Sequence, residues 1–206
     1  MVCNWFATDI SPFRHYNGGT FIDPQVIQGG AGENKIRTKI AVDKGSNWQF
    51  NNLFIEHQFI WQSDRVGLMN TVAWLNFIGA WYMFSPGSCW STAGAKITIG
   101  ADLSVAQHTS GTNTLILTGA EETILDVERE THCAGTVWTG IPAELRSGDV
   151  ELTRNNYPIQ NNKPVLATIN MSIQISAYNG GEAYLDFYTD SSYHYNVPSV
   201  WHIIDS

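Results

Sequence analysis

Strict alternation of apolar and polar residues over positions 165–178 constrains the fold more than any other feature of this chain. The apolar set is Val165, Ala167, Ile169, Met171, Ile173, Ile175 and Ala177, and the polar set between them is Thr168, Asn170, Ser172, Gln174 and Ser176. Side chains on a β-strand point alternately to opposite faces, so this pattern predicts a strand with one face buried. At about 3.3 Å per residue the strand would span roughly 45 Å, and it needs neighbouring strands along that length.

The same alternation recurs at 35–42, 53–61 and 96–105, with Gly, Asn and Pro residues between the segments. Asn179-Gly180-Gly181 tolerates the backbone of a tight turn and predicts a hairpin over residues 165–189. Pro142 and Gly148 bracket one expected helical turn at 142–148. We therefore predict an all-β chain, a two-sheet antiparallel β-sandwich or jelly-roll-like fold of about ten strands with long hairpins and little helix. Residues 1–206 are expected to form a single β-sandwich domain, and residues 1–34, rich in Gly and Pro, could form an extended N-terminal arm.

A run of apolar residues at 70–84 is unusual in a chain otherwise rich in small polar residues. It is shorter than the roughly 20 residues that a membrane-spanning helix requires, and β-branched and aromatic residues favour a strand. As a strand it is apolar on both faces, so one face would close the core while the other would meet a second chain, the N-terminal arm or a hydrophobic ligand. The interface candidates are Trp74, Phe77, Ile78, Trp81 and Tyr82.

Charge and cysteine content narrow the expected partners and compartment. The net charge is −8 with 11 scattered Lys and Arg residues, so phosphate backbones and anionic lipids would be repelled, and we expect neither nucleic-acid binding nor membrane insertion. No signal peptide is recognisable at the N-terminus, which predicts synthesis in the cytoplasm. Cys3, Cys89 and Cys133 lack the spacing of a zinc or redox motif; three free thiols or one disulfide with a leftover thiol are both open, and no cofactor is expected.

Carboxylates alternate with other residues over 125–130, which would place Asp126, Glu128 and Glu130 on one face of a strand. Such a row can act as acid and base or bind a hard cation, and it can equally form a solvated outer face. The order of these acids resembles the alternating motif of jelly-roll β-glucanases, but Ile124 stands where that motif has its first Glu. A glycosidase would use two carboxylates from Glu56, Asp126, Glu128 and Glu130.

Aromatic residues are abundant, with 8 Trp, 8 Tyr and 9 Phe. Their rings can pack in a core, anchor an interface or stack on the apolar faces of sugars. The candidates for a carbohydrate-binding platform are Tyr184, Asp186, Tyr188, Tyr193 and Trp138. His57 lies on the apolar face of its segment and is expected to be a hydrogen-bonded core residue.

These features lead to a ranked functional expectation. The leading hypothesis is a non-enzymatic structural or assembly subunit of a symmetric oligomer, namely a virion component such as a phage capsid, cement, tail or fibre protein, with copies of itself or other structural subunits as partners. The alternative is a lectin-like, carbohydrate-binding β-sandwich, and the second alternative is a jelly-roll glycoside hydrolase.

Overall fold

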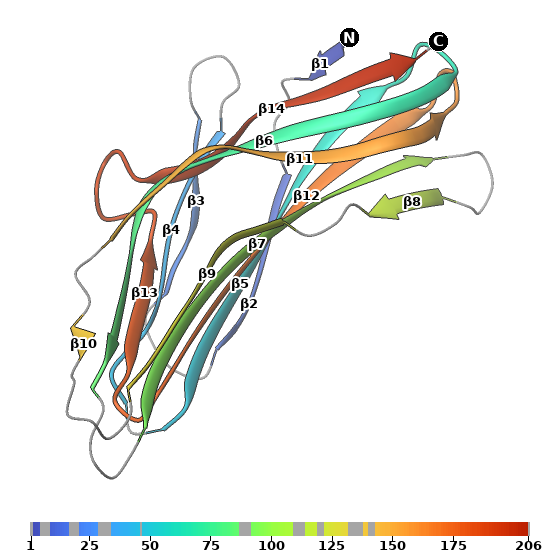
Figure 1. Ribbon diagram of the computed structural model, residues 1–206. Coiled ribbons are helices and arrows are strands. Elements are labelled where there is room, and N and C mark those ends of the chain that lie inside the picture. Colours follow the sequence, from blue (N-terminus) through green and yellow to red (C-terminus); the bar gives the residue numbers. More distant parts are fainter. Residues whose placement is uncertain are drawn as a thin grey trace.

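The computed structural model describes residues 2–4, 9–16, 21–28, 34–45, 47–86, 92–108, 114–118, 122–131, 138–139 and 143–205. Every regular element in these residues is a β-strand, and the strands form two antiparallel sheets packed face to face (Figure 1). The prediction of an all-β, two-sheet antiparallel β-sandwich is therefore confirmed. Over the described part of the chain, no helix is long and apolar enough to cross a membrane.

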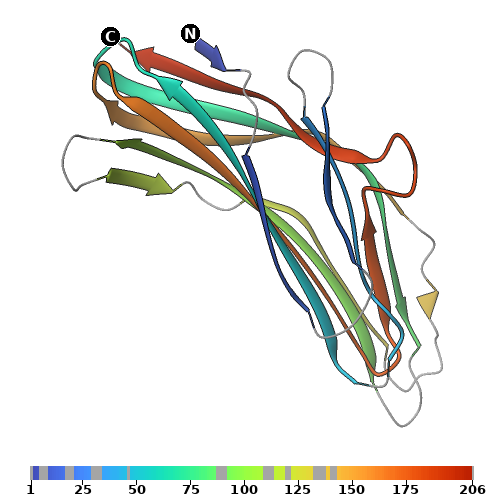
Figure 2. The same cartoon turned by 180° about the vertical axis from the view of Figure 1, so that it is seen from behind.

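The larger sheet has eight strands built around the 19-residue strand β6. Its members are β1 (Val2–Asn4), β3 (Phe21–Gln28), β4 (Asn34–Val42), β6 (Gly67–Ser85), β10 (Trp138–Thr139), β11 (Ala143–Ile159), β13 (Glu182–Asp186) and β14 (His194–Asp205). β11 follows one edge of β6, while β14 and then β13 follow the other edge. β1 pairs with the C-terminal half of β14, so the two chain ends lie at the same end of the sandwich (Figure 2).

The smaller sheet has six strands in the order β2, β5, β12, β7 and β8, with β9 also paired to β7. Its members are β2 (Asp9–Tyr16), β5 (Gln49–Gln62), β7 (Ala93–His108), β8 (Thr114–Thr118), β9 (Glu122–Thr131) and β12 (Pro164–Tyr178). β12 is central and pairs along its whole length with β5 on one side and β7 on the other. This arrangement supplies the lateral support that its length requires.

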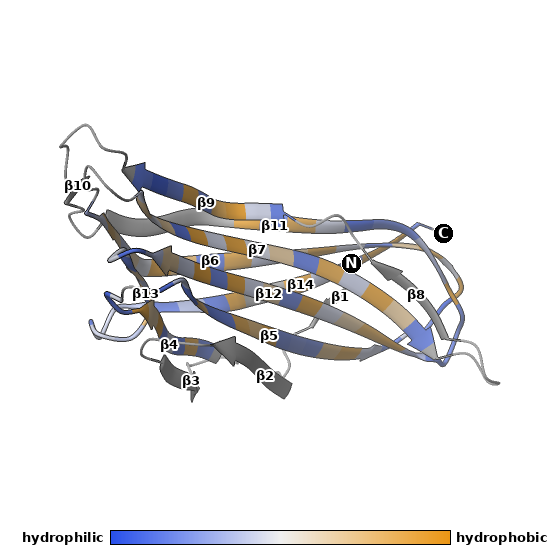
Figure 3. Ribbon diagram, turned by 90° about the horizontal axis from the view of Figure 1, so that it is seen from below, coloured by the Kyte–Doolittle hydropathy of each residue, from blue (hydrophilic) through white to orange (hydrophobic). Residues whose placement is uncertain are grey.

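The core fills the space between the two sheets. In β5, β7, β12 and most of β6, the odd-numbered residues point inward and are buried, and hydropathy alternates along the strands accordingly (Figure 3). His57 lies in this core, 1% exposed, and its Nε2 is 2.9 Å from the Tyr195 hydroxyl. The prediction of a hydrogen-bonded core histidine is confirmed.

The turn at 179–181 has the predicted backbone, with φ of 51° at Asn179 and 89° at Gly180. The predicted hairpin over 165–189 is nevertheless wrong, because β12 pairs with β5 and β7 whereas β13 pairs with β4 and β6 in the other sheet. A tight turn fixes a reversal of chain direction, and the partners on either side decide whether the two strands pair with each other or enter different sheets.

The helical turn expected at 142–148 is also wrong, because Ala143–Ile159 is one strand, β11, paired with β6. A single helical turn is weakly stable by itself. The long edge of β6 instead pairs with this segment through a ladder of backbone partners, with irregularities between Ser147 and Val150 and between Arg154 and Tyr157.

The apolar run at 70–84 forms most of β6, as predicted. Its odd-numbered face closes the core, while its even-numbered residues are half-buried on the outer face, except for the buried Ala80. Gly79 has no room for a side chain, because a Cβ there would lie 2.6 Å from the Asp186 carbonyl oxygen and 2.5 Å from Cδ1 of Phe187.

The N-terminal residues contribute strands to both sheets: β1 pairs with β14, β2 with β5 and β3 with β4. The single-domain organisation, with 1–34 as an arm, stays a prediction. The cysteine pairing also stays open, since Cys89 and Cys133 lie outside the described residues and only the backbone of Cys3 is described.

Candidate functional site

The outer face of the six-stranded sheet carries hydrogen-bonding side chains in register across four strands. Directly opposed residues of antiparallel strands point to the same face, so each rung of the ladder forms a row. From β5 through β12 and β7 to β9, successive rows are Phe50, Ser176, Lys96 and Glu128; Asn52, Gln174, Thr98 and Asp126; Phe54, Ser172 and Gly100; and Glu56, Asn170 and Asp102.

Two hollows lie in line on this face. The first, of about 510 Å³, is lined mainly by the first two rows together with Trp48. The second, of about 260 Å³, lies between Phe54 and Asp102. Gln174 lines both hollows, so they adjoin one another, and we call the two together the polar groove. From Ser176 to Asn170 on its floor, the groove extends about 20 Å at 3.3 Å per residue.

Aromatic rings flank the groove on its β5 side. Trp48 is 56% exposed and Phe54 is 39% exposed, which is unusual for such large apolar side chains. The Trp48 and Phe50 rings lie 5.0 Å apart at an interplanar angle of 41°. Each hollow therefore has an aromatic side chain with surface open to solvent.

On the opposite side of the groove, polar side chains contact one another through ion pairs and a hydrogen bond. Lys96 Nζ lies 3.4 Å from Asp126 Oδ1 and 3.6 Å from Glu128 Oε2. The Thr98 hydroxyl donates a hydrogen bond of 3.2 Å to the same Asp126 oxygen. These contacts link the side chains of the wall, and the Thr98 hydroxyl and the Asp126 carboxylate line the groove.

A similar contact orders the floor of the second hollow, where the Asn170 side-chain amide donates a 3.0 Å hydrogen bond to Asp102 Oδ1. Open aromatic surface beside fixed donors and acceptors is an arrangement suited to a ligand with apolar ring faces and peripheral hydroxyl groups.

The carboxylates here are poorly arranged for glycoside hydrolysis. Glu56 on β5 and Asp126 on β9 are three strand spacings apart, about 14 Å, and also four residues apart along the strands, about 13 Å. The resulting separation of about 19 Å is beyond the roughly 10 Å upper limit for paired catalytic carboxyl groups. Asp126 and Glu128 are closer, but Lys96 lies beside both of them. Within the described residues, no group of three or more His, Cys, Asp or Glu side chains could hold a metal ion.

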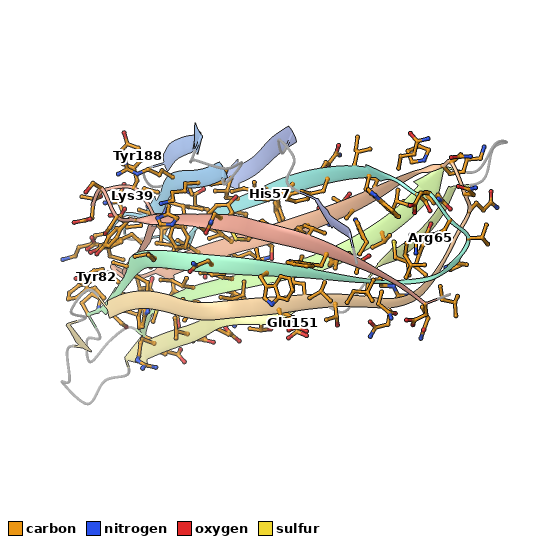
Figure 4. The ribbon with its side chains drawn as sticks, turned by 90° about the horizontal axis from the view of Figure 1, so that it is seen from above. Lys39, His57, Arg65, Tyr82, Glu151 and Tyr188 are labelled. Carbon is orange, nitrogen blue, oxygen red and sulfur yellow. The ribbon has the colours of Figure 1, made fainter. Side chains whose placement is uncertain are left out.

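The carbohydrate candidates drawn from the sequence lie on or beside the other sheet. The Tyr184 ring stacks on Tyr82 from β6, with centroids 5.1 Å apart and an interplanar angle of 15°, and Lys39 Nζ from β4 lies 4.9 Å from its centroid. β13 runs between β4 and β6, so these contacts reach the ring from opposite sides. Arg37 likewise covers Tyr188 at 4.9 Å. Lys39, Tyr82 and Tyr188 gather at one end of the molecule, away from Arg65 at the other (Figure 4).

The Asp186 side chain is also occupied by contacts within the chain. Its carboxylate accepts hydrogen bonds from the backbone N–H groups of Tyr188 and Thr189 and from the Thr189 hydroxyl, and Lys39 Nζ is 3.2 Å away. Burial alone would raise the pKa of Asp186, but the hydrogen bonds from Thr189 and Tyr188 outweigh it and lower the pKa. This carboxylate organises a turn, so the polar groove is the better candidate site, and the role of Tyr184, Asp186 and Tyr188 stays a prediction.

The two remaining candidates lie apart from the groove. Tyr193 is in the turn before β14, where its N–H donates to the Asp190 carbonyl, and Trp138 pairs through its backbone with Ser85. Nothing is described of the Trp138 side chain, so its role stays a prediction.

The interface candidates divide between the two faces of β6. Trp74, Ile78 and Tyr82 are half-buried on the outer face, where Trp74 packs edge-on against Trp201 at 6.1 Å. Phe77 is 0% exposed inside the core, so its predicted interface role is wrong in the folded chain. Trp81 also packs against the core.

Sequence reasoning missed most of the groove. Among its residues only Asp126 was singled out, whereas Trp48, Phe50, Asn52, Phe54 and Gln174 were not. The available signal was the position of Phe50 and Phe54 on the polar side of the β5 alternation, which places two apolar rings on the outer face of the sheet.

Comparisons with known proteins add no functional evidence. No family model matches the chain, and no curated protein matches it. Among solved structures, the chain is similar to "Structure of TmCBM61 in complex with beta-1,4-galactotriose at 1.4 A resolution", with 9% identity over 98% of this chain and 91% of that one and a TM-score of 0.26. It is also similar to "CBM4 structure and function", with 13% identity over 79% and 74% and a TM-score of 0.20. Scores this low indicate no close structural correspondence, so the candidate site rests on its own geometry.

Proposed function

We propose that this protein is a non-catalytic carbohydrate-binding β-sandwich that takes its ligand in the polar groove. The observation that carries the proposal is the 56% exposed Trp48 ring beside Phe50, which lines a hollow of about 510 Å³ together with the amide side chains of Asn52 and Gln174. Sugars have apolar ring faces and hydroxyl groups around the edge of the ring. A binding site for them therefore needs aromatic surface and fixed polar groups together.

The alternatives that use the same face are less well supported. Hydrolysis would require a carboxylate pair at suitable separation, and Glu56 is too far from Asp126 for that role. Nucleic acid would be disfavoured, because Asp126 and Asp102 line the groove and Lys96 is already paired.

The proposal is tested by isothermal titration calorimetry against soluble neutral polysaccharides, including xylan, mannan and mixed-linkage glucan. Trp48→Ala should weaken binding at least tenfold, since truncating a central aromatic anchor costs about 2 kcal/mol and 1.4 kcal/mol is a factor of ten. The matched control is Ile60→Ala, because Ile60 is 60% exposed on the same face of β5 but outside the groove. No binding to any polysaccharide, or equal affinity of Trp48→Ala and wild type, would refute the proposal.

A second candidate function is assembly into a symmetric oligomer, such as a virion component assembled in the cytoplasm. The half-buried outer face of β6 favours it, because Trp74, Ile78 and Tyr82 form an apolar strip on the side of the sheet away from the core. Analytical ultracentrifugation separates the two functions. A folded monomer at micromolar concentration would count against assembly, whereas an oligomer that dissociates in Trp74→Asp would support it.

A further inference from the structure

We infer that the polar groove binds an internal stretch of a neutral, unbranched polysaccharide, laid parallel to β5 and β12. This inference rests on the proposed function, because it names the ligand class of the same site. It is carried by the alignment of the two adjoining hollows along the strands, the spacing of the aromatic rings and the charge of the lining.

The arrangement of the two hollows indicates the shape of the ligand. The two hollows adjoin at Gln174 and follow one another along the strands, so together their lining residues extend over about 20 Å. That length accommodates several sugar rings in a row and exceeds the needs of a single terminal sugar.

The aromatic side chains lie along the same axis. Phe50 and Phe54 are four residues apart on β5, about 13 Å, and Trp48 lies next to Phe50. Rings at this spacing would stack on sugar units that are not adjacent, while a single sugar could reach only one of them. Two separated stacking contacts favour a chain over a monosaccharide.

Side chains on both sides of the floor argue against branches at the bound units. The floor between the walls is formed by side chains of β12, which are Asn170, Ser172, Gln174 and Ser176. Phe50 and Phe54 line the β5 wall, while Lys96, with its carboxylate partners, forms part of the other. A linear backbone fits between these walls with fewer steric conflicts than a densely branched one.

The charge of the groove lining disfavours acidic polysaccharides. Lys96 is the one cation among the described lining residues, and Asp126 and Glu128 both lie within 4 Å of its ammonium group, at 3.4 and 3.6 Å. Asp102 adds a further carboxylate in the second hollow. Uronate or sulfated polymers would bring negative charge against this lining with no unpaired cation to receive it.

The test uses calorimetry with xylo-, manno- and gluco-oligosaccharides from one sugar unit to about six, and with the longest ones after borohydride reduction of their ends. We expect affinity to rise at least tenfold from disaccharide to hexasaccharide and to be unchanged by end reduction. Phe54→Ala should weaken hexasaccharide binding several-fold and leave disaccharide binding unchanged, while Trp48→Ala should weaken both and Ile60→Ala neither.

Three outcomes would overturn the inference while leaving the proposed function intact: equal affinity for monosaccharide and hexasaccharide, loss of binding on end reduction, or tighter binding of polygalacturonate than of neutral polymers. Failure of every sugar to bind would instead remove the proposed function itself.

Discussion

Lowering the pH from 7.5 to 5 should destabilise this protein because two histidines are buried in neutral form between the sheets. His57 and His202 are 1% and 0% exposed. His57 Nε2 is paired with the Tyr195 hydroxyl, and His202 Nδ1 lies 3.0 Å from the Thr71 hydroxyl oxygen. Their other ring nitrogens have no hydrogen-bond partner among the described residues.

Burial lowers the pKa of both His57 and His202 to about 4 from an ordinary value of 6.5. Because the unfolded chain takes up these protons near pH 6.5 and the folded chain does so only near pH 4, stability is full above pH 6.5 and falls between these values. By this linkage each histidine lowers the free energy of unfolding by about 2 kcal/mol at pH 5. The pair lowers it by about 4 kcal/mol, which is a large part of a typical stability of 5–15 kcal/mol.

The free energy of unfolding can be measured by urea titration with tryptophan fluorescence at several pH values from 7.5 to 5. His57→Gln and His202→Gln should each remove about half of the pH dependence, and the double variant most of it. Titration of Asp186 does not affect this pH range. Its pKa is lowered in the folded chain, so its contribution to the free energy of unfolding is lost only at more acidic pH. A wild-type stability that changes by less than about 1 kcal/mol over this range, or a double variant with the wild-type slope, would refute the reasoning.

Three substitutions on β6 test the packing of this strand. Phe77→Ala should lower the free energy of unfolding by about 3–5 kcal/mol because its ring is fully buried, whereas Trp74→Ala on the half-buried outer face should cost about 1 kcal/mol; equal losses would contradict the assignment of the faces. Gly79→Ala should cost about 1–3 kcal/mol in the same urea titration, because its Cβ would collide with the Asp186 carbonyl, and an unchanged midpoint would show that the strands can separate there.

The alternation of apolar and polar residues was sufficient to predict the fold class and the strand that holds the centre of the smaller sheet. Burial on one face requires a period of two, and that requirement is local to each strand, so the buried positions of β12 could be read from the sequence. His57 was assigned to the core by the same rule. The tight turn at Asn179 and Gly180 was predictable because only certain residues tolerate its backbone.

Strand pairing and the candidate site were decided by the tertiary structure. The residues of β12 do not by themselves determine that this strand pairs with β5 and β7 rather than with β13. Likewise, the residues at 142–148 do not indicate that this segment forms a strand paired with the edge of β6. The groove brings together Trp48, Gln174 and Asp126, which are far apart in the sequence and meet only through the register of four strands. Periodicity along one strand shows which side chains face the same way. Only the packing of strands against one another determines which of them become neighbours, and that is a property of the whole chain.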